Sequence, residues 1–172
     1  PARILCDIFW MSFPWKKISH YNNNNKINFL EIGAGKGVYA NLLNNLLIDN
    51  LSFYTGVDIN YKKEWDSFDK SKFVFYKDTS DNILNYINDH NVIFTQSAIE
   101  HFENDLTFFK KISKYLNKKK KKFIQVHLFP SESCLYTYLF HGYRHYNYKM
   151  ISKLTESFDD NHNFYLFHIG SK

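Results

Sequence analysis

The sequence has 172 residues, of which 22 are Lys or Arg and 17 are Asp or Glu, and its formal net charge is +5. This length fits one domain that can bury a substantial core. The positive excess is concentrated in the lysine run at 118–122, which is typical of a solvated turn between a helix and a strand. No helix pattern carries a basic stripe interleaved with aromatic residues, so a nucleic-acid partner is not favoured.

Cysteine content and hydropathy bear on compartment and membrane association. Cys6 and Cys134 are far apart and form no CxxC pair, so we expect no disulfide framework and a reducing, cytoplasmic compartment. No apolar run reaches the length needed to cross a bilayer and no signal peptide is visible, so we expect no membrane partner. Because the chain begins with Pro1 and not with an initiator Met, we expect it to start inside a longer protein. Nothing in the sequence indicates an oligomeric state.

Residues 1–26 are predicted to form an N-terminal helical segment or lid. The part at 3–19 is rich in Ile, Leu, Phe and Trp, Pro14 interrupts any helix there, and an Asn-rich loop follows at 22–25. Two interpretations stay open: a helix packed on the sheet that follows, or a lid over a ligand pocket.

A glycine-rich turn between a strand and a helix organises the rest of the chain. The apolar run at 28–32 predicts a buried strand, Gly33, Gly35 and Gly37 follow it, and a helix pattern covers 37–48. Glycine permits backbone angles that a Cβ forbids and lets a ligand lie against the main chain. The free N–H groups at the start of the helix would face that ligand. The turn therefore predicts a nucleotide-type binding site.

Strands and helices alternate beyond this turn. Further strands are predicted at 51–58, 73–77, 91–95, 123–129 and 163–169, and helices at 80–89, 106–116 and 148–158. Buried strands that alternate with helices indicate an α/β fold in three layers, with a mostly parallel sheet and helices on both faces. In such a sheet, ligands bind beyond the carboxyl ends of the strands.

The sequence Glu31-x-Gly33-x-Gly35-x-Gly37 resembles motif I of the class I methyltransferases that use S-adenosylmethionine (SAM). Its third glycine comes one residue earlier than in the dinucleotide fingerprint Gly-x-Gly-x-x-Gly. The resemblance implies that the turn holds the methionine part of SAM, with the Glu31 carboxylate near the ammonium group. An ordinary tight turn with a solvated Glu31 is the alternative.

The resemblance runs from about Phe29 to Pro130. It implies a Rossmann-like methyltransferase domain over residues 27–172, with SAM as cofactor and S-adenosylhomocysteine (SAH) as product. The family's antiparallel seventh strand is not visible before Lys172. We therefore expect this domain to be incomplete at its C-terminus.

Acidic and small polar residues follow three of the later strands. Asp58 lies about twenty residues past the glycine turn, the spacing at which a carboxylate reaches a bound ribose. Asp78 either accepts a hydrogen bond from the adenine amino group, as the resemblance implies, or caps the helix that follows. The pair Gln96-Ser97 after the fourth strand is implied to face SAM. The implied cofactor-binding residues are Glu31, Gly33, Ala34, Gly35, Gly37, Asp58, Ile59, Asp78, Thr79, Gln96 and Ser97.

His, Tyr and Arg side chains after the fourth and fifth strands are the candidates for acceptor chemistry. A hydroxyl acceptor gains from a base that removes its proton, so we predict His101 or His145 as catalytic base. The substrate-binding candidates are His127, Tyr138, His141 and Arg144. The alternatives are a core role for His127 on its apolar strand, and a helix with solvated His and Arg side chains after the fifth strand. The sequence has no tight cluster of metal ligands, so no metal is implied, and the pair Glu100-His101 leaves a metal as the open alternative.

Together these features predict a SAM-dependent methyltransferase that acts on a small polar acceptor, by O-methylation of a sugar or nucleotide-sugar in surface-polysaccharide biosynthesis. The acceptor class rests on the Tyr, His and Arg segment after the fifth strand and on a loose likeness to methyltransferases of such pathways. Alternatives from other classes are an NAD-linked oxidoreductase, a non-catalytic module that binds SAM, and an RNA methyltransferase.

Overall fold

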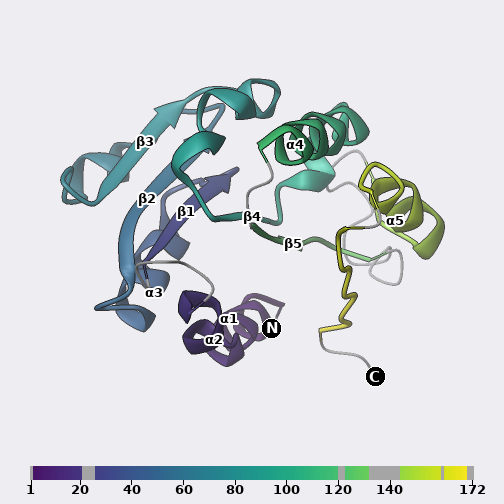
Figure 1. The fold of residues 1–172 in the computed structure, drawn as a ribbon. Coiled ribbons are helices and arrows are strands. Elements are labelled where there is room, and N and C mark those ends of the chain that lie inside the picture. Colours follow the sequence, from purple (N-terminus) through teal and green to yellow (C-terminus); the bar gives the residue numbers. More distant parts are fainter. Residues whose placement is uncertain (1, 21–25, 120–122, 132–143, 160, 170–172) are drawn as a thin grey trace.

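A five-stranded parallel sheet forms the centre of the computed structural model, which describes residues 2–20, 26–119, 123–131, 144–159 and 161–169 (Figure 1). The strands are β1 (Ile27–Ile32), β2 (Leu51–Asp58), β3 (Phe73–Lys77), β4 (Val92–Gln96) and β5 (Ile124–Leu128). Their order is β3-β2-β1-β4-β5, and every neighbouring pair is parallel. The predicted α/β fold with a parallel sheet is confirmed.

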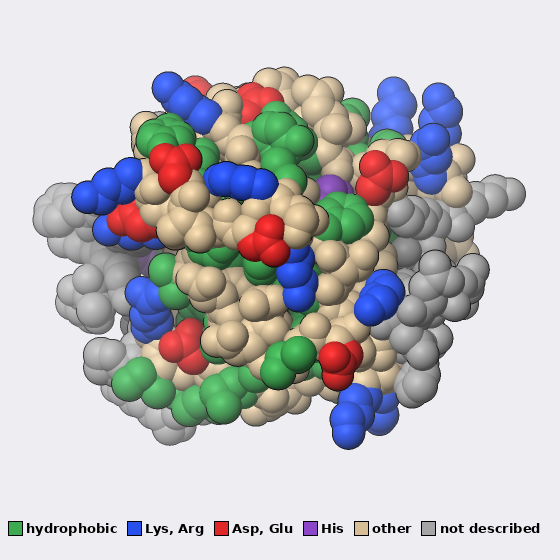
Figure 2. Space-filling view, turned by 90° about the vertical axis from the view of Figure 1, so that its left-hand side faces the viewer, with side chains coloured by type: hydrophobic (Ala, Val, Ile, Leu, Met, Phe, Trp, Pro, Cys, Tyr) green, Lys and Arg blue, Asp and Glu red, His purple; other side chains and the backbone are tan. Residues whose placement is uncertain are grey.

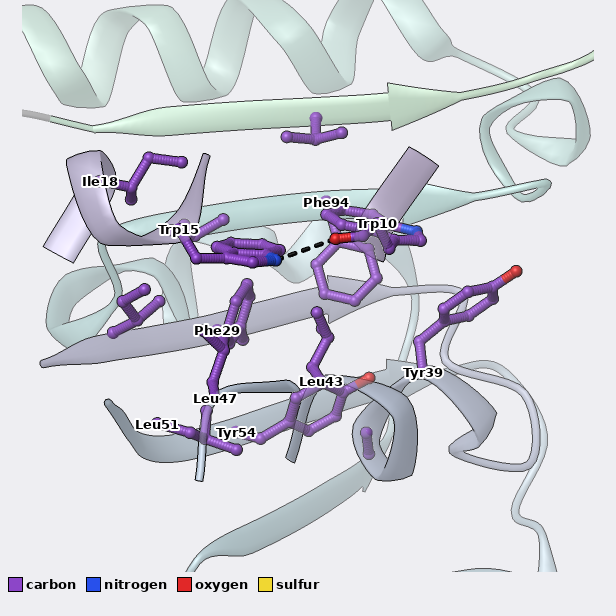
Figure 3. Packing of buried hydrophobic residues seen from close by; sticks show 14 of the residues in the cluster. Trp10, Trp15, Ile18, Phe29, Tyr39, Leu43, Leu47, Leu51, Tyr54 and Phe94 are labelled. Carbon is purple, nitrogen blue, oxygen red and sulfur yellow. Dashed lines mark hydrogen bonds between the residues drawn. The ribbon is translucent and has the colours of Figure 1, made fainter. Parts of the chain in front are cut away.

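One face of the sheet is covered by α1 (Ala2–Ser12), α2 (Trp15–His20), α3 (Val38–Leu46) and the 3-10 turn η1 (Lys63–Ser67). Trp10 and Trp15 lie in the core of this layer, and their stacked rings are 5.8 Å apart (Figure 3). Trp10 also packs edge-on against Phe94 of β4. The N-terminal helices therefore share their core with the sheet, and the division at residue 26 stays a prediction.

The opposite face is covered by α4 (Asp105–Lys119), α5 (Tyr148–Thr155) and the 3-10 turns η2 (Ser80–Asn85), η3 (Ile87–Asp89) and η4 (Ile99–His101). Leu30 and Ile93 of the sheet share a core cluster with Phe108, Ile112 and Leu116, which lie at helical spacing along α4. Helices on both faces complete the three predicted layers.

Two predicted elements differ from the structure. The helix predicted at 80–89 is instead the pair η2 and η3, because Asn82 leaves the helical region (φ −94°, ψ 16°) and its side chain donates to the Asp78 carboxylate. The strand predicted at 163–169 is wrong: these residues form irregular chain, in which Tyr165 is 78% exposed. An apolar run makes a strand only where a partner supplies the ladder of backbone hydrogen bonds.

The surface on the β3 side of the sheet carries basic and acidic side chains interspersed with one another (Figure 2). This arrangement gives that face no field of a single sign. Among the described helices, none combines the length and the apolar character that a bilayer crossing requires.

Candidate cofactor site

The carboxyl ends of β1 and β4 lie side by side at the point where the strand order reverses. In open α/β sheets this crevice is where ligands bind. The turns after the two strands touch there, because a Cβ added to Gly33 would lie 2.3 Å from the Cβ of Ala98. Glycine at position 33 thus allows the glycine loop (residues 33–37) to pack against the turn after β4.

The glycine loop adopts backbone angles that other residues rarely reach. The φ angles are +84° at Gly33, +51° at Gly35 and +77° at Gly37. The backbone N–H groups of Gly33 and Ala34 donate to the carbonyl oxygen of Val57 at 2.8 and 3.1 Å, which anchors the loop to β2. Gly37 is the N-cap of α3, so the free N–H groups at the start of this helix adjoin the loop.

Asp58, the predicted ribose ligand, contacts the glycine loop directly. Its Oδ2 atom accepts a hydrogen bond from the Gly35 N–H at 2.9 Å, and its Oδ1 atom accepts one from the Asn60 N–H at 2.9 Å. A carboxylate has about four lone-pair sites, so acceptor capacity remains for a diol. The next side chain, Ile59, is 62% exposed and offers an apolar surface at the same strand end.

Glu31 is buried just before the glycine loop, with 1% of its surface exposed. Its carboxylate accepts a hydrogen bond from the hydroxyl of Tyr54, which is itself fully buried. Burial, assisted by repulsion from the Asp58 carboxylate, raises the pKa of Glu31 well above its ordinary value. A cation bound beside Glu31 would oppose this shift by stabilising the charged carboxylate.

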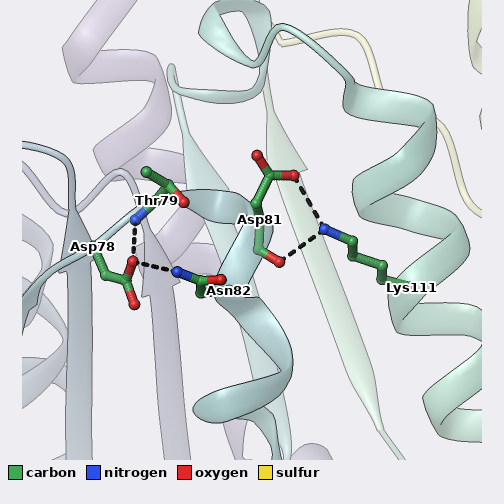
Figure 4. Close-up of polar contacts among 5 residues, drawn as sticks. All are labelled: Asp78, Thr79, Asp81, Asn82 and Lys111. Atoms are coloured by element: carbon green, nitrogen blue, oxygen red, sulfur yellow. Dashed lines mark hydrogen bonds and ion pairs between the residues drawn. The ribbon is translucent and has the colours of Figure 1, made fainter.

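Asp78 at the end of β3 is engaged by the turn that follows it (Figure 4). Its Oδ1 atom accepts hydrogen bonds of 2.7 Å from the Thr79 N–H and from Nδ2 of Asn82, and its Oδ2 atom accepts one of 2.6 Å from the Tyr86 hydroxyl. These hydrogen bonds, with that from Tyr86 first, lower the pKa of Asp78. The N-cap of η2 is Thr79 and has no side-chain cap hydrogen bond, so Asp78 binds the side chains of the turn without capping it in the usual way. The adenine contact stays a prediction.

The pair Gln96-Ser97 lies at the carboxyl end of β4, as predicted. Oε1 of Gln96 accepts a hydrogen bond of 3.1 Å from Nε1 of Trp10, so α1 reaches this end of the sheet. Ser97 has a φ of +48°, which is uncommon outside glycine, and its N–H donates to the Leu128 carbonyl at 2.8 Å. Such strained positions concentrate at functional sites.

The predicted catalytic and acceptor histidines lie on separate elements. His101 is exposed in η4 and His145 is half-buried before α5, and each stays a candidate base. His127 of β5 has its Nδ1 atom 2.9 Å from Oγ1 of Thr95 and packs edge-on against Phe109. Burial lowers the pKa of His127 to about 3, so the ring is neutral. These contacts match the core alternative, and an acceptor role for His127 stays a prediction.

Arg144 belongs to a polar network between α4 and the segment before α5. Its Nη1 atom forms an ion pair of 2.8 Å with Oδ1 of Asp105, and the Tyr146 hydroxyl donates to the other oxygen of Asp105 at 2.8 Å. The predicted acceptor role of Arg144 stays a prediction, and Tyr138 and His141 lie outside the described residues. Within the described ranges, no group of three or more His, Cys, Asp or Glu side chains could hold a metal ion.

Sequence reasoning missed three aromatic residues at this site. Tyr54 carried a usable signal, because it lies in the next predicted strand and alternation places Phe29 and Glu31 on one sheet face. In the structure Tyr54 pairs with Phe29 on that face. Trp10 and Trp65 carried none, since Trp10 is 86 residues from Gln96, and Trp65 is 30 residues from the glycine whose carbonyl it binds. Only packing brings these pairs together.

The fold is similar to solved methyltransferase structures, whereas no protein-family model and no curated protein matches the sequence. The plantazolicin methyltransferase BamL, in complex with SAH and a triazolic desmethylPZN analogue, is 19% identical with a TM-score of 0.56, over 88% of this chain and 54% of that one. A SAM-dependent methyltransferase from Archaeoglobus fulgidus is 17% identical with a TM-score of 0.55, over 87% and 67%. The plantazolicin methyltransferase BpumL, in complex with SAH, is 15% identical with a TM-score of 0.57, over 91% and 56%.

These likenesses define the class of fold. The chain has the Rossmann-like α/β fold found in class I SAM-dependent methyltransferases. It spans a little over half the length of the two plantazolicin methyltransferases, with 54% and 56% of their chains covered.

Proposed function

We propose that the chain forms the cofactor-binding part of a SAM-dependent methyltransferase. The contact that carries this proposal is the 2.9 Å hydrogen bond between the Gly35 N–H and the Asp58 carboxylate. It joins a loop suited to the amino-acid end of SAM to an acid suited to its ribose. Both lie at the carboxyl ends of adjacent strands beside the switch point of the sheet, where the fold binds ligands.

The residues around this contact suit SAM in charge and in hydrogen-bonding groups. The buried Glu31 carboxylate suits the ammonium group, and the N–H groups at the start of α3 suit the carboxylate of the methionine part. Asp58 offers two acceptor oxygens to the ribose diol, and the exposed Ile59 offers an apolar surface to the adenine. In this proposal Thr79 and Gln96 lie at the rim of the site, at the ends of β3 and β4.

Bound SAM supplies a methyl group that is already electrophilic on its sulfonium. The protein has to align the acceptor oxygen with that methyl group and keep water out. In our proposal His101, which follows β4 and is exposed, takes the proton from the acceptor hydroxyl, with His145 as the second candidate. Trp10 of α1 donates a hydrogen bond to Gln96, a proposed cofactor ligand, from the core beneath the site.

The acceptor that we propose is a small polar molecule that is methylated on oxygen. Our first choice is a sugar or nucleotide-sugar in the cytoplasm. Support comes from the Tyr, His and Arg residues of the segment after β5, which begins at the same edge of the sheet as the cofactor site. A compound resembling the triazolic desmethylPZN analogue bound in BamL is the competing acceptor.

Parallel calorimetric titrations with SAH and with NAD⁺ test the cofactor. We expect SAH to bind and NAD⁺ to give no heat of binding, and the opposite result would replace the methyltransferase by an oxidoreductase. Transfer of labelled methyl from SAM to sugars, nucleotide-sugars, a desmethylPZN analogue and RNA then tests the acceptor. SAH binding without transfer to any of them would indicate a non-catalytic module, and RNA as acceptor would show binding that weakens steeply with salt.

A further inference from the structure

The connection from β2 to β3 contacts three consecutive residues of the glycine loop. Nε1 of Trp65 donates a hydrogen bond of 2.8 Å to the Gly35 carbonyl, and Glu64 forms an ion pair of 2.9 Å with Lys36. Just after η1, the ring of Phe68 lies against the third residue, because a Cβ added to Gly37 would be 2.9 Å from its Cζ atom. The connection from β2 to β3 therefore fastens the loop from one side.

Among these contacts, the hydrogen bond from Trp65 is the one that constrains the loop most. Trp65 is 3% exposed, and its ring stacks on Phe75 with centroids 5.3 Å apart and planes 13° apart. An indole N–H can only donate, and here it donates to a backbone carbonyl. The ion pair between Lys36 and Glu64 is exposed, with 66% and 34% of their side-chain surfaces accessible, so water and salt screen it.

Gly35 is consequently held from both sides, by the end of β2 and by the connection that follows it. Its N–H donates to Asp58 at the end of β2, and its carbonyl accepts from Trp65 in η1. Its φ of +51° is one of many that a glycine can adopt, and a Cβ there would meet nothing within 4 Å. Local sterics therefore leave Gly35 free. These two hydrogen bonds select its conformation together with the turn hydrogen bond of 2.9 Å from the Gly37 N–H to the Ala34 carbonyl.

We propose that Trp65 is a positioning residue for the cofactor site: its indole N–H holds the Gly35 peptide in the orientation in which the glycine loop receives the amino-acid end of SAM. This inference rests on the proposed function. Holding the loop in its bound conformation before the cofactor arrives improves affinity, because the ordering cost is met during folding. Loss of one such neutral hydrogen bond corresponds to about a fivefold to tenfold loss of affinity.

Trp65→Phe tests this role, and Trp15→Phe is its matched control. Both substitutions keep a buried ring and remove an indole N–H that donates to a backbone carbonyl. Trp65 donates to the Gly35 carbonyl at 2.8 Å, and Trp15 donates to the Trp10 carbonyl at 2.9 Å. We expect W65F to bind SAH about fivefold to tenfold more weakly by calorimetry, and W15F to bind it as the wild type does. A second readout, taken without ligand, is amide hydrogen exchange over residues 33–40, which we expect to accelerate in W65F alone.

Several outcomes would overturn the role of Trp65. Wild-type SAH affinity in W65F would do so, and so would equal losses of affinity in both variants, because the effect would then be a general loss of stability. A different outcome is that the wild type binds no SAH while amide hydrogen exchange over residues 33–40 still accelerates in W65F alone. In that case the proposed function fails, and the role of Trp65 in positioning the loop stands. If W65F does not fold, 3-benzothienylalanine at position 65 keeps both rings, removes the N–H and decides the same question.

Discussion

The Gly35 N–H donates a hydrogen bond of 2.9 Å to the Asp58 carboxylate, and this contact ties the loop after β1 to the end of β2. The acid proposed to bind the ribose is therefore also part of the structure of the glycine loop. A change at Asp58 should disturb both ends of the cofactor site together.

We expect Asp58→Ala to weaken SAH binding by about 30-fold or more, because the ribose loses its acceptor and Gly35 loses a partner. Calorimetry measures the affinity and circular dichroism checks the fold. Asp69→Ala is the matched control, since Oδ1 of Asp69 also accepts from the N–H two residues ahead, that of Ser71, at 2.9 Å. Equal SAH affinities in the two variants would contradict the ribose assignment.

Gly33→Ala should destabilise the protein much more than Gly35→Ala. Both positions have positive φ, which costs a residue with a Cβ about 1–2 kcal/mol. At Gly33 the new Cβ would also lie 2.3 Å from Ala98, whereas at Gly35 it would meet nothing within 4 Å. Urea denaturation should therefore show a loss of about 2–4 kcal/mol for the first variant and about 1 kcal/mol for the second. Equal losses would mean that the turns after β1 and β4 do not touch.

Glu100 in η4 makes the stability depend on pH. Burial raises its pKa from an ordinary value of 4.5 to about 7. Below pH 4.5 the carboxyl is protonated in both states. As the pH rises from 4.5 to 7, the unfolded chain loses this proton and the folded protein keeps it, so stability falls. Above pH 7 the penalty is constant.

Glu100→Gln removes that ionisation, so its advantage over the wild type should grow between pH 4.5 and 7 and reach at most about 3 kcal/mol at pH 8. Urea unfolding of both proteins from pH 4 to 8 measures it. Parallel stability curves for the two proteins would show that Glu100 keeps an ordinary pKa.

Changes in the network of Arg144, Asp105 and Tyr146 should lower the stability of the fold and leave the affinity for SAH unchanged. We expect Arg144→Met to cost about 2–4 kcal/mol, because it leaves the Asp105 carboxylate without its cation, and Tyr146→Phe about 1–2 kcal/mol. SAH affinity should be unchanged in both folded variants. A raised acceptor KM in R144M but not in Y146F would support the predicted acceptor role of Arg144, and equal KM values would assign the guanidinium to structure alone.

Several features of the site were predictable because they depend on neighbours in the chain. Three glycines after an apolar run indicate a turn with positive φ angles, and the structure has them. Asp58 was predictable at the end of a strand from the apolar run before it. Its place near the glycine loop was predictable because parallel strands end at one edge of the sheet. The environment of His127 was left between two alternatives, because one strand residue does not reveal which helix covers it.

The residue pattern by itself determined the alternation of strands and helices and the glycine turn, because these follow from periodicity and backbone sterics within about ten residues. Only the tertiary structure decided that Trp65 binds the Gly35 carbonyl, that Trp10 reaches Gln96 and that residues 163–169 form no strand. Such contacts join segments that are distant along the chain. Their formation depends on how whole layers pack, which local pattern does not specify.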